Sequence, residues 1–240
     1  MKDLAQTTRL LVATDFDGVL APIVSNPASA RALPESVAAL RALGDLPETE
    51  VAIITGRSLE VLRRLLDPPP QWHLVGSHGA ETSDHSLDLD ALQPAVIKLA
   101  ARLEHLVGGR PGVAIEPKPT GAAVHVRNAA PEVAQAVLTE VREGPAAEPG
   151  IFTTEGKCVI ELAVVDVSKG AAITQLRADL GATAVLYVGD DVTDEKAFLA
   201  LSEGDVGVKV GPGETAATVR VADPEAVATL FAELAALRKG

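Results

Sequence analysis

The sequence predicts an α/β fold in which a Rossmann-like parallel-sheet core is interrupted by an inserted α+β segment. Two observations support this prediction. Short apolar runs alternate with helical segments in the first third of the chain and again after residue 168, and such alternation is typical of βαβ units. Between these parts the order of elements is α-β-β-α-β-β, which favours a four-stranded antiparallel sheet with two helices on one face.

The first part of the core is predicted from buried-type strands separated by capped helices. Pro34 near the start of one helix and Gly44 just past its end are residues that favour those positions, and Ser58 can cap the next helix. The expected elements are a strand at 10–14, a helix at 34–43, a strand at 51–54, a helix at 58–66 and a strand at 72–75.

The insert is predicted from a change of pattern after a polar connector at 81–90. Its expected elements are helices at 93–107 and 131–142, and strands at 113–116, 122–127, 151–154 and 157–163, the last two joined by a turn at Glu155-Gly156. The core pattern then resumes with a helix at 168–180, a strand at 184–188, a helix at 193–201, a strand at 206–210 and a helix at 224–238. We therefore assign residues 1–81 and 164–240 to the core and residues 82–163 to the inserted domain.

Composition excludes several classes of protein. The net charge of -12 argues against nucleic acid, which is bound through basic patches. It also means that an anionic substrate needs a local metal or suitably placed Lys and Arg side chains.

No apolar run reaches membrane-spanning length, and the N-terminus leads directly into the first strand without room for a signal peptide. Cys158, the single cysteine, suits a reducing compartment, so we expect a cytoplasmic protein; its oligomeric state is left open, with a monomer favoured.

Carboxylates follow two matching strands. Asp15 and Asp17 end the first apolar run, and Gly189-Asp190-Asp191-Val192-Thr193-Asp194 follows the strand at 184–188. The carboxyl ends of strands are where open α/β sheets bind ligands, and carboxylates at two strand ends can hold one Mg²⁺. Each cluster alone could instead be a solvated turn in which Asp caps a helix. Their occurrence after two matching strands favours a metal site.

The order of these motifs resembles that of the haloacid dehalogenase superfamily phosphatases. Asp-x-Asp comes first, then Thr55-Gly56-Arg57, a lone Lys169 and Gly-Asp-Asp-x-x-Asp, and the insert lies where that superfamily places its larger type of cap. Within it, the chain is most similar to trehalose-6-phosphate phosphatases. The segments that carry this similarity are 15–23, 76–81, Glu116-Pro117-Lys118, His125-Val126-Arg127 and 189–195.

The resemblance implies roles for the core residues. Asp15 would be the nucleophile and Asp17 the general acid and base, since a carboxylate nucleophile divides hydrolysis into two displacements. Mg²⁺ would be held by Asp15, Asp190 and the backbone carbonyl of Asp17. Lys169 would neutralise Asp15 and a phosphate oxygen. Further partners would be Thr55 for the phosphate oxygens and Asp191 and Asp194 in indirect contact with the metal.

The resemblance also makes the insert a cap domain that recognises the sugar. Its matching positions are Glu116, Lys118, Arg127, Lys157 and Glu161, and from the core Arg57 and His78 would face the substrate. Spacing alone favours the solvent side of an antiparallel sheet for such charges, and the resemblance reverses that interpretation. Val126 departs from the polar residue expected in some relatives.

The leading functional hypothesis is therefore Mg²⁺-dependent hydrolysis of trehalose 6-phosphate through an aspartyl-phosphate. A phosphatase for a related sugar phosphate is an alternative, with sucrose phosphate, a glycosylglycerate phosphate or a pseudodisaccharide phosphate as substrate. A phosphomutase is a third hypothesis. A non-enzymatic sensor is disfavoured because every catalytic position is filled. The expected partner is a small sugar phosphate.

Overall fold

A computed structural model of the chain describes residues 1–83, 88–156 and 158–240. Its contacts divide the chain into two units, one formed by Met1–Ser86 with Ser168–Gly240 and the other by Leu87–Val167. Lys157, expected to bind the sugar, lies outside the described residues.

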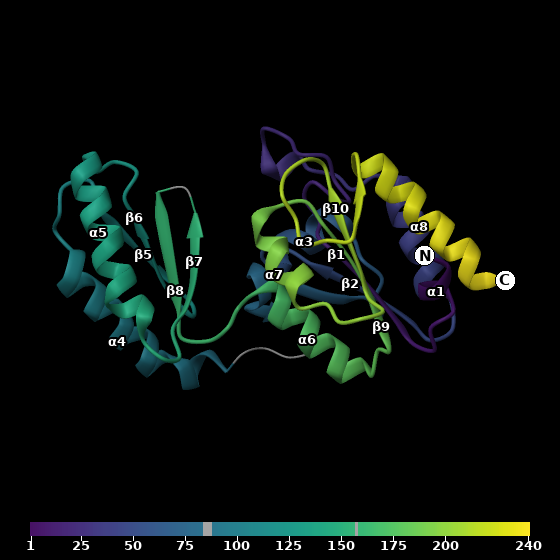
Figure 1. Cartoon of the computed structure of the whole chain (residues 1–240), viewed down its shortest axis with the longest axis horizontal. Helices are drawn as coiled ribbons and strands as arrows, with labels where there is room; N and C mark the ends of the chain where they lie inside the picture. The colour runs from purple at the N-terminus through teal and green to yellow at the C-terminus, as the bar shows by residue number, and fades with distance from the viewer. Residues whose placement is uncertain (84–87, 157) are drawn as a thin grey trace. The chain divides into compact units, whose positions relative to one another are not determined.

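The first unit is built on a largely parallel sheet, as the sequence predicts (Figure 1). Its described strands lie in the order β11 (Val219–Val221), β10 (Val206–Val210), β9 (Ala184–Gly189), β1 (Leu10–Thr14), β2 (Thr49–Ile54), β3 (His73–Gly76) and β4 (Glu81–Thr82). All neighbours are parallel except β4, which pairs antiparallel with β3. Because β4 joins this sheet, the first unit extends past the boundary at residue 81 that the sequence favoured.

The register of β1 fixes the position of the site. Thr14, its last residue, pairs with Ile53 of β2 on one side and with Val188 of β9 on the other. The residues that follow these strands therefore leave the sheet at one edge. Asp15 and the segments that begin at Thr55 and Asp190 thus meet there, although up to 175 residues separate them in the sequence.

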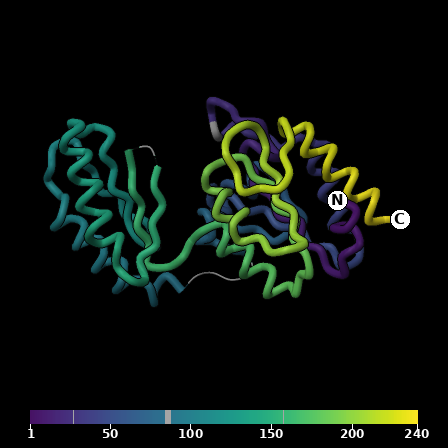
Figure 2. The backbone as a smooth tube through the Cα atoms, viewed as in Figure 1, coloured from purple at the N-terminus to yellow at the C-terminus, as the bar shows by residue number. Residues whose placement is uncertain are grey.

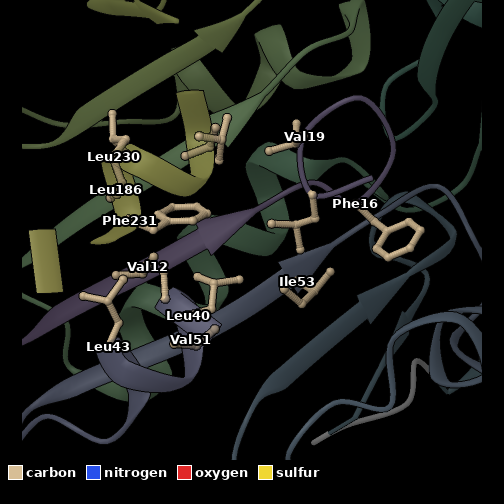
Figure 3. Packing of buried hydrophobic residues seen from close by; sticks show 14 of the residues in the cluster. Val12, Phe16, Val19, Leu40, Leu43, Val51, Ile53, Leu186, Leu230 and Phe231 are labelled. Carbon is tan, nitrogen blue, oxygen red and sulfur yellow. The ribbon is translucent and has the colours of Figure 1, made fainter. Parts of the chain in front are cut away.

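Helices cover both faces of this sheet. Alternate residues of β1 point to opposite sides, with Leu10 and Val12 in one apolar cluster and Leu11 and Ala13 in another. Helices α1 (Lys2–Ala5), α2 (Pro34–Gly44), α3 (Leu59–Leu66) and α8 (Pro224–Lys239) contribute to the first cluster, and α6 (Lys169–Leu180) and α7 (Val192–Leu199) to the second. Figure 3 shows the first cluster, which is mostly aliphatic because the chain has few aromatic residues. Both termini belong to this unit, where α8 packs on α1 and α2 (Figure 2).

The second unit is the predicted four-stranded antiparallel sheet with two helices. Its strands lie in the order β5 (Ala114–Lys118), β6 (Gly121–His125), β8 (Val159–Ala163) and β7 (Phe152–Gly156). Helices α4 (Leu89–Val107) and α5 (Pro131–Glu143) pack with one sheet face, where Val124, Ile160 and Leu162 are buried.

Two predicted boundaries in this unit were wrong. The turn expected at Glu155-Gly156 is not there, because both residues still pair with β8 as part of β7. Helix α4 begins at Leu89, four residues before the expected start, because the carboxylate of Asp88 accepts the N–H of Ala91 and caps it. Pro94 consequently lies inside the helix.

Candidate active site

Asp15 is held at the end of β1 by contacts to its backbone and to both carboxylate oxygens. Its N–H donates to the carbonyl of Val188. Oδ1 accepts the N–H of Phe16 at 2.6 Å, and Oδ2 accepts Nζ of Lys169 at 2.6 Å. Burial raises the pKa of Asp15 to about 7, although Lys169 acts against this. The carboxylate is therefore costly to ionise without a further cation.

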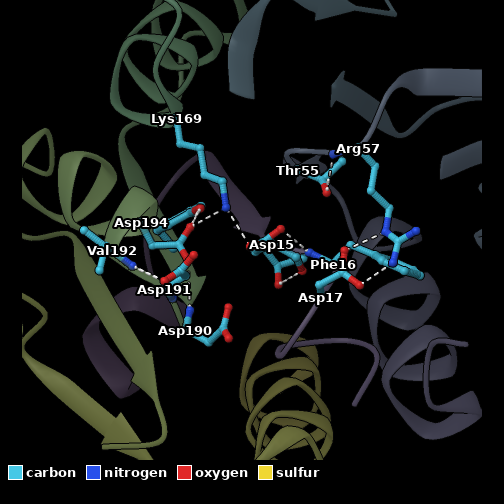
Figure 4. Close-up of polar contacts among 12 residues, drawn as sticks. Asp15, Phe16, Asp17, Thr55, Arg57, Lys169, Asp190, Asp191, Val192 and Asp194 are labelled. Carbon is cyan, nitrogen blue, oxygen red and sulfur yellow. Dashed lines mark hydrogen bonds and ion pairs between the residues drawn. The ribbon is translucent and has the colours of Figure 1, made fainter. Parts of the chain in front are cut away.

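Lys169 lies between two carboxylates. It is the first residue of α6 and is 2% exposed, and its Nζ donates to Asp15 and to Oδ1 of Asp194 at 2.6 and 2.7 Å (Figure 4). Burial acts to lower the pKa of Lys169, but the two carboxylates outweigh it, so that the pKa is raised. Gly170 allows the start of α6 to pack closely on α7, because a Cβ on residue 170 would lie 2.4 Å from the carbonyl oxygen of Lys196.

Asp194 organises the turn after β9. It is fully buried, and its Oδ2 accepts the N–H groups of Asp190 and Asp191, each at 2.9 Å. Asp191 and Asp194 form a capping box at the start of α7. Asp191 and Asp194, which the sequence analysis expected in indirect contact with the metal, thus also have a structural role. They hold the segment that carries Asp190.

Asp190 approaches the Asp-x-Asp segment closely. Gly18 has a φ of +72°, and a Cβ there would lie 2.0 Å from Oδ2 of Asp190. Burial, with Asp194, raises the pKa of Asp190 to about 6. Lys209 of β10, which is buried, donates from Nζ to the backbone carbonyl of Asp190. No local pattern indicated a role for Lys209, which lies within an ordinary apolar strand.

The acidic residues can hold a cation. Among the described residues, Asp15, Asp190 and Asp194 each offer an oxygen, and these oxygens lie within 4.8 Å of one another. Oxygen-only ligands of this kind suit a hard divalent ion. Each oxygen of Asp194 already accepts two hydrogen bonds, whereas each oxygen of Asp15 accepts one, so Asp15 and Asp190 have the greater remaining capacity to bind a cation. The carboxylate of Asp17 is outside this group; the predicted use of its backbone carbonyl stays a prediction.

Asp17 instead forms a bidentate ion pair. Nε and Nη2 of Arg57 donate to its two oxygens at 2.6 and 2.7 Å, and the guanidinium lies 5.6 Å from the centre of the Phe16 ring. The hydrogen bond to Asp17 raises the pKa of Arg57. Thr55 is buried, and its hydroxyl accepts the N–H of Arg57 at 3.2 Å. The Thr-Gly-Arg motif therefore supplies Arg57 as the cationic partner of Asp17, and Lys169 is the cationic partner of Asp15.

The turn that carries His78 packs on this motif. Ser77 and His78 have positive φ values of 50° and 58°, an uncommon backbone conformation for residues other than glycine. The N–H of His78 donates to the carbonyl of Thr55, and a Cβ on Gly56 would lie 2.6 Å from the His78 ring. Glu81 secures the turn by accepting the hydroxyl of Ser77 and the N–H of Leu59. The sequence had not assigned Glu81 a role.

A cleft of about 430 Å³ opens beside these groups within the first unit. Asp17, Arg57 and His78 line it with Ile23, Val24 and Gly56. Three predicted site residues thus share one cavity that has both ionic and apolar walls.

In the second unit, several predicted sugar contacts share one region of the sheet. Glu116 of β5 is in register with Ala123 of β6, and Ala123 is in register with Glu161 of β8. Glu116 accepts Nζ of Lys118 at 2.7 Å and contacts Nε2 of His125 at 2.9 Å, and these hydrogen bonds lower its pKa. His125 was not among the predicted site residues. Arg127 is exposed just beyond the end of β6.

The order of motifs around one edge of a parallel sheet places the protein in the haloacid dehalogenase class. Within that class, the chain belongs to the trehalose-phosphatase family, whose model matches residues 13–226.

Known proteins similar to this chain carry the same description. A trehalose-phosphate phosphatase of Mycobacterium avium is 36% identical over 80% of this chain and 51% of its own length. One from Mycobacterium marinum is 35% identical over 95% of this chain and 62% of its own length. The solved Aspergillus fumigatus trehalose-6-phosphate phosphatase has a TM-score of 0.79 and 26% identity, covering 98% of this chain and 95% of that one. The chain thus spans about half to three-fifths of these curated mycobacterial relatives. Among the described residues, no helix has the length and apolar character needed to cross a bilayer.

Proposed function

We propose that this protein hydrolyses trehalose 6-phosphate to trehalose and phosphate through an aspartyl-phosphate. The observation that carries the proposal is the separate pairing of two aspartates in a member of this family. Asp15 is paired with Lys169, while Asp17 is paired with Arg57 and lines the cleft. These different surroundings support our assignment of attack on phosphorus to Asp15 and of proton transfer to Asp17.

In the first displacement, a carboxylate oxygen of Asp15 forms a bond to phosphorus as the bond from phosphorus to the sugar oxygen breaks. Asp17 gives a proton to that departing oxygen. In the second displacement, Asp17 takes a proton from water, whose oxygen attacks phosphorus and releases Asp15. Lys169 balances charge on Asp15 throughout, and Thr55 with nearby N–H groups binds phosphate oxygens.

Mg²⁺ is the cation we infer for the acidic cluster. Asp15 and Asp190 would hold it, with the backbone carbonyl of Asp17. When bound, it would neutralise the repulsion between a carboxylate and a phosphate. A divalent cation also fits a chain whose net charge of -12 would otherwise repel the substrate.

We infer that the second unit, which corresponds to the inserted domain predicted at residues 82–163, recognises the sugar. The support is the group of charged residues on β5, just beyond β6 and on β8, to which the resemblance to the family assigns the sugar contacts. A cytoplasmic location is part of the proposal, supported by the single free thiol of Cys158. The partner is a sugar phosphate.

Phosphate release from a panel of substrates tests the proposal. The panel contains trehalose 6-phosphate, sucrose phosphate, a glycosylglycerate phosphate and glucose 6-phosphate, each with Mg²⁺. We expect the highest kcat/KM for trehalose 6-phosphate. A higher value for another ester would support the alternative phosphatases, and isomerisation without phosphate release would support a phosphomutase.

Alanine variants of the cap residues are expected to lower kcat/KM for trehalose 6-phosphate selectively. The residues are Glu116, Lys118, Arg127, Lys157 and Glu161. Each loss should be about 5- to 150-fold, corresponding to about 1–3 kcal/mol for an unsatisfied polar contact. Hydrolysis of p-nitrophenyl phosphate, which carries no sugar, should change little.

The matched control is Glu140→Ala, which removes an ion pair with Arg110 in the same unit. It should leave the ratio of the two kcat/KM values unchanged. Equal losses on both substrates in the five variants would show that these residues support the fold or the phosphate site instead.

Mg²⁺ is expected to stabilise the folded protein more at pH 7.5 than at pH 5. The raised pKa values of about 7 for Asp15 and about 6 for Asp190 mean that the metal-free fold binds more protons than the unfolded chain between about pH 4 and pH 7. Stability contributed by these groups therefore falls as pH rises through that window. Mg²⁺ binds the ionised groups, so protons compete with it, and its apparent affinity should be about 10-fold or more weaker at pH 5.

Thermal unfolding with Mg²⁺ and with a chelator, at both pH values, measures this difference. Asp190→Asn, which replaces an anionic ligand by a neutral and weaker one of the same shape, should lose most of the Mg²⁺-dependent rise in Tm. A rise that is equal at both pH values, or unchanged in the variant, would contradict the metal assignment.

A further inference from the structure

Tyr187, the single tyrosine of the chain, makes a polar contact within an otherwise apolar cluster. It lies on β9, is fully buried, and its ring packs edge-to-face with Phe198 at 5.6 Å between centroids. Its hydroxyl donates to Oδ1 of Asp194 at 2.5 Å. In the sequence it reads as one more apolar residue of a buried strand.

A phenylalanine would satisfy the packing of this position, so the hydroxyl needs a separate explanation. Burying a hydroxyl is unfavourable unless it has a partner, and Asp194 is that partner. Burial and the neighbouring Asp194 raise the pKa of Tyr187 above its ordinary value, so the hydroxyl keeps its proton and acts as a donor.

We propose that Tyr187 is a positioning residue that acts on Asp15 through Asp194 and Lys169. The inference rests on the proposed function, in which Asp15 is the nucleophile. Oδ1 of Asp194 accepts both the Tyr187 hydroxyl and Nζ of Lys169, and the same Nζ lies 2.6 Å from Asp15. A continuous set of hydrogen bonds thus joins Tyr187 to the reacting carboxylate.

The arrangement fixes the orientation of Asp194. Its Oδ2 accepts two backbone N–H groups from the turn after β9, and its Oδ1 accepts two side-chain donors. With the hydroxyl present, Oδ1 of Asp194 is shared between Tyr187 and Lys169, and the Lys169 ammonium interacts with both Asp194 and Asp15. Without it, Asp194 would attract that ammonium more strongly and draw it away from Asp15. Lys169 would then neutralise charge at Asp15 and the phosphate less well during reaction.

This role predicts a loss in kcat rather than in KM. Tyr187→Phe should lower kcat for p-nitrophenyl phosphate and for the best sugar phosphate alike by about 10-fold, as expected for loss of a hydrogen bond to a charged group. KM should stay within about 2-fold, because the hydroxyl contacts no part of the substrate. The matched control is Phe198→Leu, which disturbs the same ring without touching Asp194 and should lower Tm while leaving kcat within about 2-fold.

A spectroscopic test needs no variant. Wild-type protein labelled with ¹³Cζ-tyrosine gives a single resonance, because Tyr187 is the only tyrosine. Adding Mg²⁺ with fluoroberyllate, a mimic of the phosphorylated carboxylate, should shift this resonance. Wild-type kcat in Tyr187→Phe, or a resonance that does not move at saturating Mg²⁺ and fluoroberyllate, would overturn the inference. Failure to hydrolyse trehalose 6-phosphate would instead count against the proposed substrate, since neither readout depends on that sugar.

Discussion

Asp15→Asn is expected to abolish hydrolysis of every phosphate monoester while the protein stays folded. The amide keeps the shape of the side chain but cannot form the bond to phosphorus that the proposed first displacement requires. Phosphate release from trehalose 6-phosphate and from p-nitrophenyl phosphate should therefore fall to background together. Activity is measured beside thermal unfolding, so that loss of chemistry is separated from loss of fold.

The same variant makes a prediction about stability. Burial raises the pKa of Asp15 to about 7, so the ionised carboxylate opposes folding of the metal-free protein at neutral pH. An uncharged amide removes that cost, and Lys169 still has Asp194 as a partner. In the presence of a chelator, the variant should therefore match or exceed the wild-type Tm at pH 8 and lose this advantage at pH 4. Retention of more than a few per cent of activity would show that Asp15 is not the covalent nucleophile.

The positions of the carboxylates could be predicted because strand patterns and strand ends are local features. The apolar runs at 10–14 and 184–188 identify buried strands, and parallel pairing brings whatever follows them to one edge. The central strands and long helices are similarly evident in the sequence. The short elements β4 and β11 were missed because two or three residues leave no periodicity, and their pairing depends on the finished sheet.

The partners within the site were less predictable. Arg57 and Asp17 are 40 residues apart, and nothing local indicates that their side chains meet. Lys209 and Tyr187 were missed for another reason. Each occupies a strand position, where a lysine or tyrosine reads as an edge or packing residue until its neighbours are known. Long-range side-chain pairing thus decides which residues support the chemistry, while the sequence pattern identifies where it occurs.

Asp17→Asn is expected to lower kcat for trehalose 6-phosphate by about 10²–10⁴-fold, the usual range for loss of acid–base catalysis. The sugar oxygen needs a proton as it leaves, and the attacking water must lose one, so both displacements should slow. The effect should differ between substrates. p-Nitrophenolate departs without a proton, so the first displacement should stay fast with p-nitrophenyl phosphate, while hydrolysis of the phosphorylated enzyme stays slow.

This difference gives the variant a kinetic signature. Mixed rapidly with p-nitrophenyl phosphate, Asp17→Asn should release a burst of p-nitrophenolate close to one equivalent per enzyme, followed by slow turnover. Asp179→Asn is the control, since Asp179 is an exposed carboxylate whose neighbour is Gln175 on the far part of α6, and it should behave as wild type. If Asp17→Asn slows both substrates equally and shows no burst, proton transfer is not its role. The ion pair with Arg57 would then serve chiefly to hold the Thr-Gly-Arg loop against the Asp-x-Asp segment.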